Sequence, residues 1–196
     1  MFRARYADLI MPQPAVAGLV LAAGAGRRFG SPKALARTPD GRSWLALAVG
    51  ALRDAGCSPL YVAVSASLDE VLPLVPADAE PVLIPDPSEG MSVSLRAGLI
   101  AATTSDAVAL AIVTVDTPEL PASAVRRLMG AVDAASLVQA VYGDRPGHPV
   151  VIGRDHWSAL AASIVGDRGA RDYLRAHGAE RIDCADLWSG EDRDTR

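Results

Sequence analysis

The chain has 196 residues, half of them hydrophobic, and this length supports one well-buried domain but not two full enzymatic ones. A formal net charge of −4 and a pI near 5.3 give no attractive field for nucleic acid. The apolar runs are too short for a membrane span, so we expect a small-molecule partner, no nucleic acid and no membrane.

The N-terminal segment and the cysteines indicate the compartment. Met1–Tyr6 lacks the apolar core of a secretory signal, so we expect residues 1–14 to be a loose extension and residues 15–196 to be one domain. Cys57 and Cys184 lie far apart without metal-ligand spacing. Such cysteines are typical of reduced, buried residues in a cytoplasmic protein.

A glycine-rich stretch, residues 21–33, follows the apolar run Val16–Val20, which predicts a buried first strand. A strand that opens into Gly-x-Gly is typical of a phosphate-binding loop, since glycine lets backbone N–H groups approach an anion. Neither the dinucleotide fingerprint nor the P-loop fits the spacing. Arg28 and Lys33 add two cations, which favours a nucleoside triphosphate and its leaving pyrophosphate. The alternative is a solvated turn with ordinary basic residues.

The pattern L-A-A-G-x-G-x-R-x-G-x-x-K in this stretch resembles the signature of the MobA-like nucleotidyltransferases, most of all the molybdenum cofactor cytidylyltransferases. The resemblance implies that Arg28 and Lys33 are catalytic, and that the loop binds nucleotide through Leu21, Ala22, Ala23, Gly24, Gly26, Arg28 and Lys33. In guanylyltransferases of the same superfamily, the start of this loop resembles L-A-G-G instead. Ala22-Ala23 would leave less room for a purine.

The following segments alternate between helical and strand patterns. A 3.6-residue period predicts a helix over Ser43–Ala55 that Gly56 ends, then strands over residues 60–64 and 81–84 with a weak helix over 67–74 between them. Alternation of this kind predicts a mostly parallel sheet covered on both faces. The fold class is therefore α/β with three layers, and the resemblance implies a Rossmann-like nucleotidyltransferase domain.

Residues 85–98 contain prolines and Gly90 that predict a loop, and Ser92 is a candidate cap for the helix after it. The simplest interpretation is a capped strand-to-helix turn. In the family, the equivalent G-M-S-x-S-L loop lines the base and ribose, which implies nucleotide binding by Pro85, Gly90, Ser92 and Ser94.

The most continuously apolar stretch, residues 108–115, predicts a central parallel strand that ends at Asp116. Ligands of open α/β sheets bind beyond the carboxyl ends of strands. If this strand adjoins the first one, Asp116 faces the glycine loop, and Mg²⁺ would separate its carboxylate from a triphosphate. A helix cap before Pro118 is the alternative. The family's D-x-P motif carries its metal ligand at this position.

The C-terminal third predicts a helix over residues 121–134, strands over 137–141 and 148–152 with a turn-rich loop between them, and a helix near 154–163. Gly166–Arg171 then opens a further helix and resembles the G-D-x-G-A-R motif of the cytidylyltransferases. The resemblance implies an acceptor site with His148, Asp167, Arg168 and Arg171. His148 and the arginines also fit structural or solvated roles.

The tail resembles the family's D-x-D-T ending, which implies that Asp194, rather than Asp192, is a second metal ligand beside Asp116. The expected reaction is cytidylyl transfer from CTP to the phosphate of molybdopterin or the molybdenum cofactor, which would then pass to a molybdoenzyme or its maturation factors. An anionic acceptor phosphate needs no general base, in keeping with the lack of a nucleophile-and-histidine set. The alternatives are a guanylyltransferase, a dinucleotide-dependent oxidoreductase and a non-catalytic sensor or chaperone.

Overall fold

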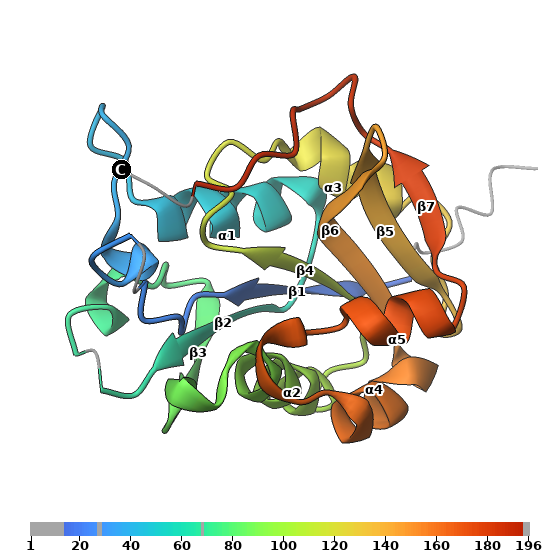
Figure 1. Cartoon of the computed structure of the whole chain (residues 1–196), viewed down its shortest axis with the longest axis horizontal. Helices are drawn as coiled ribbons and strands as arrows, with labels where there is room; N and C mark the ends of the chain where they lie inside the picture. Colours follow the sequence, from blue (N-terminus) through green and yellow to red (C-terminus); the bar gives the residue numbers. More distant parts are fainter. Residues whose placement is uncertain (1–13, 27–28, 68, 194–196) are drawn as a thin grey trace, which may run out of the picture.

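The computed structural model describes residues 14–26, 29–67 and 69–193, in which one seven-stranded sheet forms the centre of the molecule (Figure 1). The strand order is β3-β2-β1-β4-β6-β5-β7. Only β6 runs antiparallel to its neighbours. This confirms the predicted α/β class with a mostly parallel sheet. The strands are β1 (Val16–Leu21), β2 (Leu60–Ser65), β3 (Ala79–Ile84), β4 (Ala109–Thr114), β5 (Leu137–Tyr142), β6 (Arg145–Gly153) and β7 (Glu180–Asp183).

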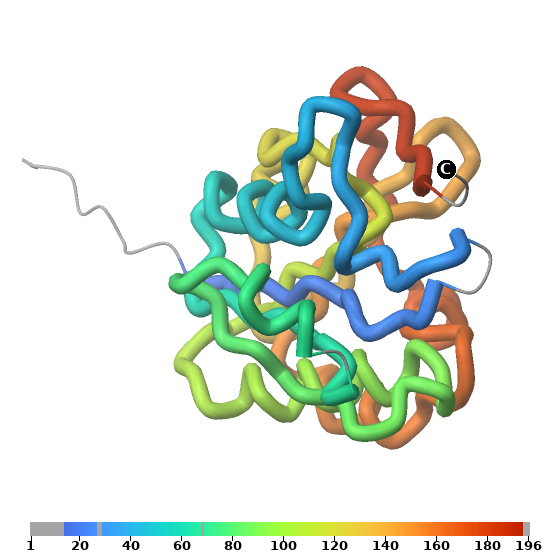
Figure 2. The backbone as a smooth tube through the Cα atoms, turned by 90° about the vertical axis from the view of Figure 1, so that its left-hand side faces the viewer, coloured from blue at the N-terminus to red at the C-terminus, as the bar shows by residue number. Residues whose placement is uncertain are grey.

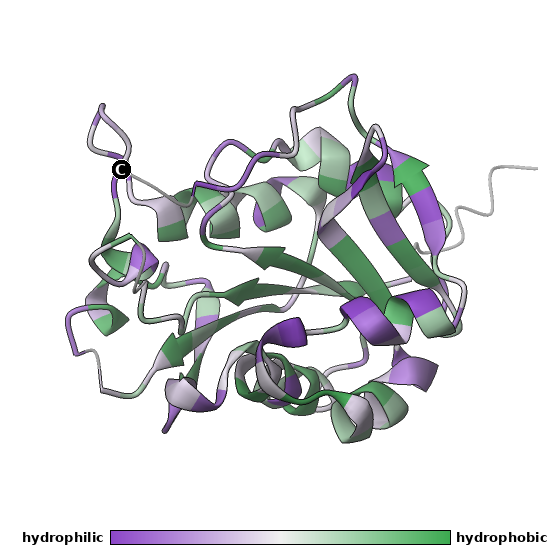
Figure 3. Cartoon of the chain, viewed as in Figure 1, coloured by the Kyte–Doolittle hydropathy of each residue, from purple (hydrophilic) through white to green (hydrophobic). Residues whose placement is uncertain are grey.

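Helices cover both faces of this sheet. In Figure 1, α1 (Trp44–Ala55) and α3 (Ala122–Leu128) lie above it, while α2 (Met91–Ala102), α4 (Trp157–Ser163) and α5 (Arg171–Ala176) lie below. Each face has its own hydrophobic core. The apolar colouring of the strands in Figure 3 shows why, since strands buried on both faces have no polar side to offer water.

Helix α1 confirms the prediction for its segment. The Ser43 side chain caps the helix by accepting a hydrogen bond from the Ala46 N–H, and Gly56 ends it with φ +97°. A residue with a Cβ is strained at that φ, whereas glycine adopts it readily. The cap, the periodicity and the terminating glycine all specify the same helix, which is why the sequence predicts it well.

Three predicted segments differ in the structure. The described part of 67–74 contains turns and a 3₁₀ helix, Leu72–Leu74, instead of the expected helix, because Pro73 and Pro76 break the helical hydrogen bonding. The helix expected over 121–134 ends at Leu128. The predicted 154–163 helix divides into a 3₁₀ turn, Arg154–His156, followed by α4.

Two strands differ from the expected ones. β6 begins at Arg145, so most of the expected 142–147 loop is instead a tight β5–β6 hairpin. β7 was not predicted at all. It is a short edge strand of mostly exposed residues with the sequence ERID, and its polar composition hides it from pattern analysis.

The loops at the carboxyl ends of the parallel strands gather on one side of the molecule, on the right in Figure 2. They are the glycine loop after β1, the segment between β3 and α2, the segment after β4 and the connection into α5. This is the edge at which open α/β sheets bind ligands. No helix in the described ranges is long and apolar enough to cross a membrane.

Candidate active site

The glycine loop is closed tightly at its base. Gly26 has φ +60°, its carbonyl accepts a hydrogen bond from Gly30 N at 2.8 Å, and a Cβ at Gly26 would lie 1.8 Å from the Ser31 carbonyl oxygen. A larger residue would force this turn open. At exposed Gly24, by contrast, a Cβ would meet nothing within 4 Å, which leaves room for a ligand against the backbone. Arg28 lies outside the described residues.

The two alanines of the loop occupy a different place from the one expected. Ala22 and Ala23 are each 2% exposed, and they pack into the two cores on opposite faces of the sheet. Their methyl groups therefore do not line the open site. The expectation that Ala22-Ala23 leaves less room for a purine stays a prediction.

Asp116 and Lys33 meet across the first and fourth strands. β1 pairs with β4 in parallel, with Leu21 opposite Thr114. The two strands are therefore neighbours, as the prediction for Asp116 assumed. The Lys33 Nζ lies 2.9 Å from Asp116 Oδ2, and the two side chains are 14% and 22% exposed. The sheet thus brings together two of the predicted catalytic residues.

The second oxygen of the Asp116 carboxylate differs from the one that pairs with Lys33. Oδ1 is buried and has no hydrogen-bond partner in the described part of the chain. An unpaired buried carboxylate oxygen is costly, so the residue fits a cation that the protein itself does not supply. Among the described residues no three His, Cys, Asp or Glu side chains form a metal cluster. Mg²⁺ suits such a site, because it keeps several waters and phosphate ligands beside one or two carboxylates.

The loop before α2 packs directly on the connection before α5. α2 begins after Gly90, so Ser92 lies in its first turn and does not cap it, contrary to expectation. At Gly90, whose φ is +96°, a Cβ would lie 2.5 Å from Asp167 Oδ1 and within 3 Å of the Gly166 carbonyl. The expected nucleotide and acceptor loops are therefore in contact. Ser92 and Ser94 are buried, whereas Pro85 is exposed.

A cavity of about 390 Å³ lies between these loops and the sheet. The predicted residues that line it are Leu21, Asp116, His148, Arg168 and Arg171. Asp167, Lys33 and the other described members of the predicted set lie outside the lining. Sequence analysis missed the polar residues Thr117, Gln139, Arg145 and Asp192, and also Trp188, all of which line the cavity.

His148 enters the cavity from β6. Its Nδ1 lies 3.3 Å from the Ile112 carbonyl oxygen, which can only accept, so Nδ1 carries the proton and the neutral ring has Nε2 as an acceptor. Burial lowers the pKa of His148, while the Ile112 carbonyl and the charges of Asp116 and Asp192 act in the opposite direction. The neutral ring is a hydrogen-bonding group and not a cation.

The segment after β7 runs back over the site, across the top of Figure 1. Trp188, Gly190 and Asp192 line the cavity. The Arg193 N–H then donates to the Asp116 carbonyl at 2.8 Å, and the Arg193 side chain pairs with Glu119. Asp194 lies outside the described residues. Arg193, the residue before Asp194, nonetheless contacts Asp116, so this end of the chain returns to the site.

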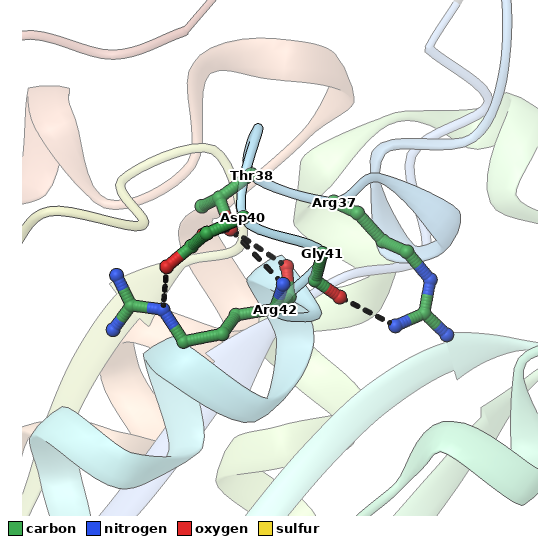
Figure 4. Close-up of polar contacts among 5 residues, drawn as sticks. All are labelled: Arg37, Thr38, Asp40, Gly41 and Arg42. Carbon is green, nitrogen blue, oxygen red and sulfur yellow. Dashed lines mark hydrogen bonds and ion pairs between the residues drawn. The ribbon is translucent and has the colours of Figure 1, made fainter.

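The turn over residues 37–42 follows the 3₁₀ helix Lys33–Leu35 and is held by its own polar contacts (Figure 4). Arg42 Nε donates to Asp40 at 2.8 Å, Arg37 donates to the Gly41 carbonyl at 2.8 Å, and the Thr38 hydroxyl bonds both Asp40 and the Arg42 backbone. Hydrogen bonding to Thr38 holds the pKa of Asp40 below its usual value. These contacts are exposed, so they shape the turn more than they stabilise the fold.

Comparison with known proteins gives a family and one named relative. The family described as MobA-like NTP transferase domain matches residues 18–182. Nicotine blue oxidoreductase of Paenarthrobacter nicotinovorans is 36% identical over 195 residues, which cover 93% of each protein.

Solved structures share the whole architecture. The homologue of Mycobacterium tuberculosis Rv0371c from Mycobacterium sp. strain JC1 superimposes with a TM-score of 0.79 at 31% identity, covering 92% of this chain and 90% of the other. Rv0371c itself gives 0.79 at 25% identity, covering 93% and 94%. A nucleotidyl transferase from Methanothermobacter thermautotroptrophicus gives 0.71 at 19% identity, covering 86% and 87%, which shows a shared fold alone.

Proposed function

This chain belongs to the MobA-like NTP transferase family, and on that premise we propose that it transfers a cytidylyl group from CTP to the phosphate of molybdopterin, with or without bound molybdenum. The acceptor phosphate oxygen forms the new bond to the α-phosphorus, the bond to the bridging oxygen breaks, and pyrophosphate leaves. In this proposal the reaction takes place in the cytoplasm and serves a molybdoenzyme.

The observation that carries the proposal is the Lys33–Asp116 pair near the carboxyl ends of β1 and β4. Asp116 Oδ1 is buried there and has no hydrogen-bond partner within the described ranges. When a triphosphate binds, Lys33 turns to the β- and γ-phosphates, where negative charge grows as pyrophosphate leaves. Arg28 is assigned the same task, as a prediction. Asp116 is then free to hold Mg²⁺, which would neutralise phosphate charge at the reacting phosphorus. A structure of Rv0371c from Mycobacterium tuberculosis with manganese supports a divalent metal.

Most of the remaining predicted residues keep their assignments within this proposal. The backbone at Gly24 and Gly26 approaches the triphosphate, and the segment with Pro85, Gly90, Ser92 and Ser94 faces the base and ribose. Arg168 and Arg171 receive the acceptor phosphate, and His148 borders the same cavity. Asp167 acts through Gly90 and the packing of the two loops instead of touching the acceptor. Asp194 is assigned as a second ligand of the metal.

A second candidate is an oxidoreductase, and it is favoured by the 36% identity to nicotine blue oxidoreductase over 93% of both chains. The cavity would then receive a planar heterocycle for reduction instead of a phosphorylated acceptor. Against this candidate, the spacing of the glycine loop does not fit the dinucleotide fingerprint. The two candidates differ in whether a triphosphate is consumed.

One experiment separates them. Purified protein is given Mg²⁺ and each of the four nucleoside triphosphates, with and without molybdopterin, and pyrophosphate release is measured. In parallel, NADH and NADPH oxidation is followed with nicotine blue as the acceptor. The proposal expects molybdopterin-dependent release from CTP above that from GTP. Equal or greater release from GTP contradicts the cytidylyl assignment, and nucleotide oxidation without pyrophosphate release favours the oxidoreductase.

A further inference from the structure

The floor of the cavity is a row of three side chains on adjacent strands. In the sheet register Gln139 of β5 lies opposite Val150 of β6, and Val150 lies opposite Ile112 of β4. All three line the cavity. Since alternate residues of a strand share a face, Gln139 points to the same side of the sheet as buried Leu137. An amide thus stands in a row that is otherwise apolar.

Gln139 has no visible structural task. Its side chain, which is partly exposed, makes no hydrogen bond to any residue in the ranges that the structure describes. Two apolar side chains from helices, Leu95 of α2 and Leu174 of α5, line the same cavity. A side-chain amide carries two N–H donors and a carbonyl acceptor. Without a partner in the described ranges, these donors and this acceptor stay available to a ligand.

The neighbouring groups show what kind of ligand suits this floor. His148 offers Nε2 as an acceptor, because Nδ1 is bonded to the Ile112 carbonyl. Gln139 adds both a donor and an acceptor. The volume of about 390 Å³ falls within the range of about 300–1,000 Å³ that small-molecule pockets occupy. A cavity that places apolar side chains beside hydrogen-bond donors and acceptors fits a flat heterocycle with an amide-like edge.

We propose that Gln139 is a specificity-determining residue, which recognises the hydrogen-bonding edge of a planar nitrogen heterocycle in the acceptor. This inference rests on the proposed function, because it assumes that the cavity receives the acceptor. The phosphate arm of that acceptor points to Arg168, Arg171 and the Asp116 end, and the ring lies over the row Gln139–Val150–Ile112. A site that forms hydrogen bonds to a polar edge of its ligand discriminates strongly against analogues without that edge. An apolar pocket discriminates far less between ligands of different size or shape.

The test uses Gln139→Met, which keeps side-chain length and removes the amide, with Glu80→Met on the opposite edge strand β3 as the control. Binding of 6-hydroxymethylpterin, a fluorescent heterocycle without phosphate, is measured by titration, and thermal unfolding is followed for each variant. We expect the Kd for the pterin to rise at least about tenfold in Gln139→Met, equal to about 1.4 kcal/mol. Its Tm should equal or exceed that of the wild type, and the KM for CTP should stay unchanged.

The outcomes separate this inference from the proposed function. An unchanged pterin Kd in Gln139→Met, or a wild type that does not bind the pterin, overturns the role of Gln139. A lower Tm with unchanged binding shows a structural amide and overturns it as well. If the wild type binds the pterin through Gln139 but releases no pyrophosphate from any triphosphate, the proposed function fails while the recognition of the heterocycle stands.

Discussion

Asp116 is held by two kinds of contact that serve different purposes. Its backbone carbonyl accepts a hydrogen bond from Arg193, and its carboxylate pairs with Lys33 through one oxygen only. The other oxygen is buried and has no hydrogen-bond partner among the residues that the structure describes. The backbone contact fixes the position of the residue, whereas the carboxylate keeps unused capacity for a cation. This division predicts that the charge of Asp116 matters more for turnover than for folding.

Asp116→Asn should reduce pyrophosphate release at least about a hundredfold, since a key electrostatic group contributes roughly 3 kcal/mol to transition-state stabilisation. The substitution keeps size and shape, so we expect the Tm to change little. Asp78→Asn, which removes the exposed ion pair with Arg53, is the matched control and should leave turnover intact. If Asp116→Asn unfolds while its folded fraction remains active, the residue is a structural cap.

Lys33→Ala should change metal binding and catalysis in opposite directions. In the absence of nucleotide, the ammonium pairs with the carboxylate that Mg²⁺ needs. Removing it should tighten Mn²⁺ binding to the protein alone, measured by electron paramagnetic resonance. The same variant should show a higher KM for CTP and lower turnover, because the leaving pyrophosphate loses its cation. Mn²⁺ affinity and kinetics that both match the wild type would contradict the role of Lys33.

At the level of elements, the segment after β7 forms one wall of the site. Arg145 donates to the Ser189 carbonyl at 3.1 Å, and the Tyr142 and Trp188 rings meet edge to face at 5.3 Å. A Cβ at Gly190, whose φ is +73°, would lie 2.2 Å from the Tyr142 ring. Only a glycine lets the chain pass this close to the β5–β6 hairpin and continue to Asp116.

We expect the two aspartates of this segment to affect different substrates. Asp194→Ala should lower Mg²⁺-dependent turnover, and raising the Mg²⁺ concentration should restore part of it, since a missing metal ligand responds to metal concentration. Asp192→Ala should instead raise the KM for the acceptor without such rescue, because Asp192 lines the cavity. A truncation after Ser189 that keeps full activity at sub-millimolar Mg²⁺ would show that neither carboxylate is needed.

An element can be predicted from the sequence when its own residues specify it, and cannot when it depends on contacts with distant segments. The α1 helix is specified locally by Ser43, its apolar period and Gly56, so its sequence suffices. The strand β7 is polar and short, and only its pairing with β5 makes it a strand. In the site, the glycine loop and Asp116 stand out because they follow apolar strands. Gln139 and Asp192 do not, since their place depends on sheet register and on the course of the tail.

At the scale of the whole molecule, the two cysteines report on global unfolding. Cys57 is 4% exposed and Cys184 is fully buried. Burial raises the pKa of the Cys57 thiol to about 12 and raises that of Cys184 as well, so both stay protonated at neutral pH. The thiolate is the reactive form.

We therefore predict that neither thiol reacts measurably with an aromatic disulfide reagent at pH 8 in the native protein. In denaturant both thiols should react at the rate of free cysteine. The denaturant concentration at which half of the thiols become reactive should equal the midpoint of the loss of circular dichroism. Rapid labelling of one thiol without denaturant would show that part of the core opens independently of the rest.

The Lys33–Asp116 ion pair bears on when, during synthesis, the chain becomes able to bind a nucleotide. The two residues are 83 positions apart, and β4 lies beside β1 in the centre of the sheet. On the ribosome, the glycine loop emerges together with β2 and β3, long before β4 has been synthesised. A nascent chain that stops short of β4 has its phosphate loop but no carboxylate opposite it. We therefore expect triphosphate binding only after the ribosome has delivered β4, in the middle of the sheet.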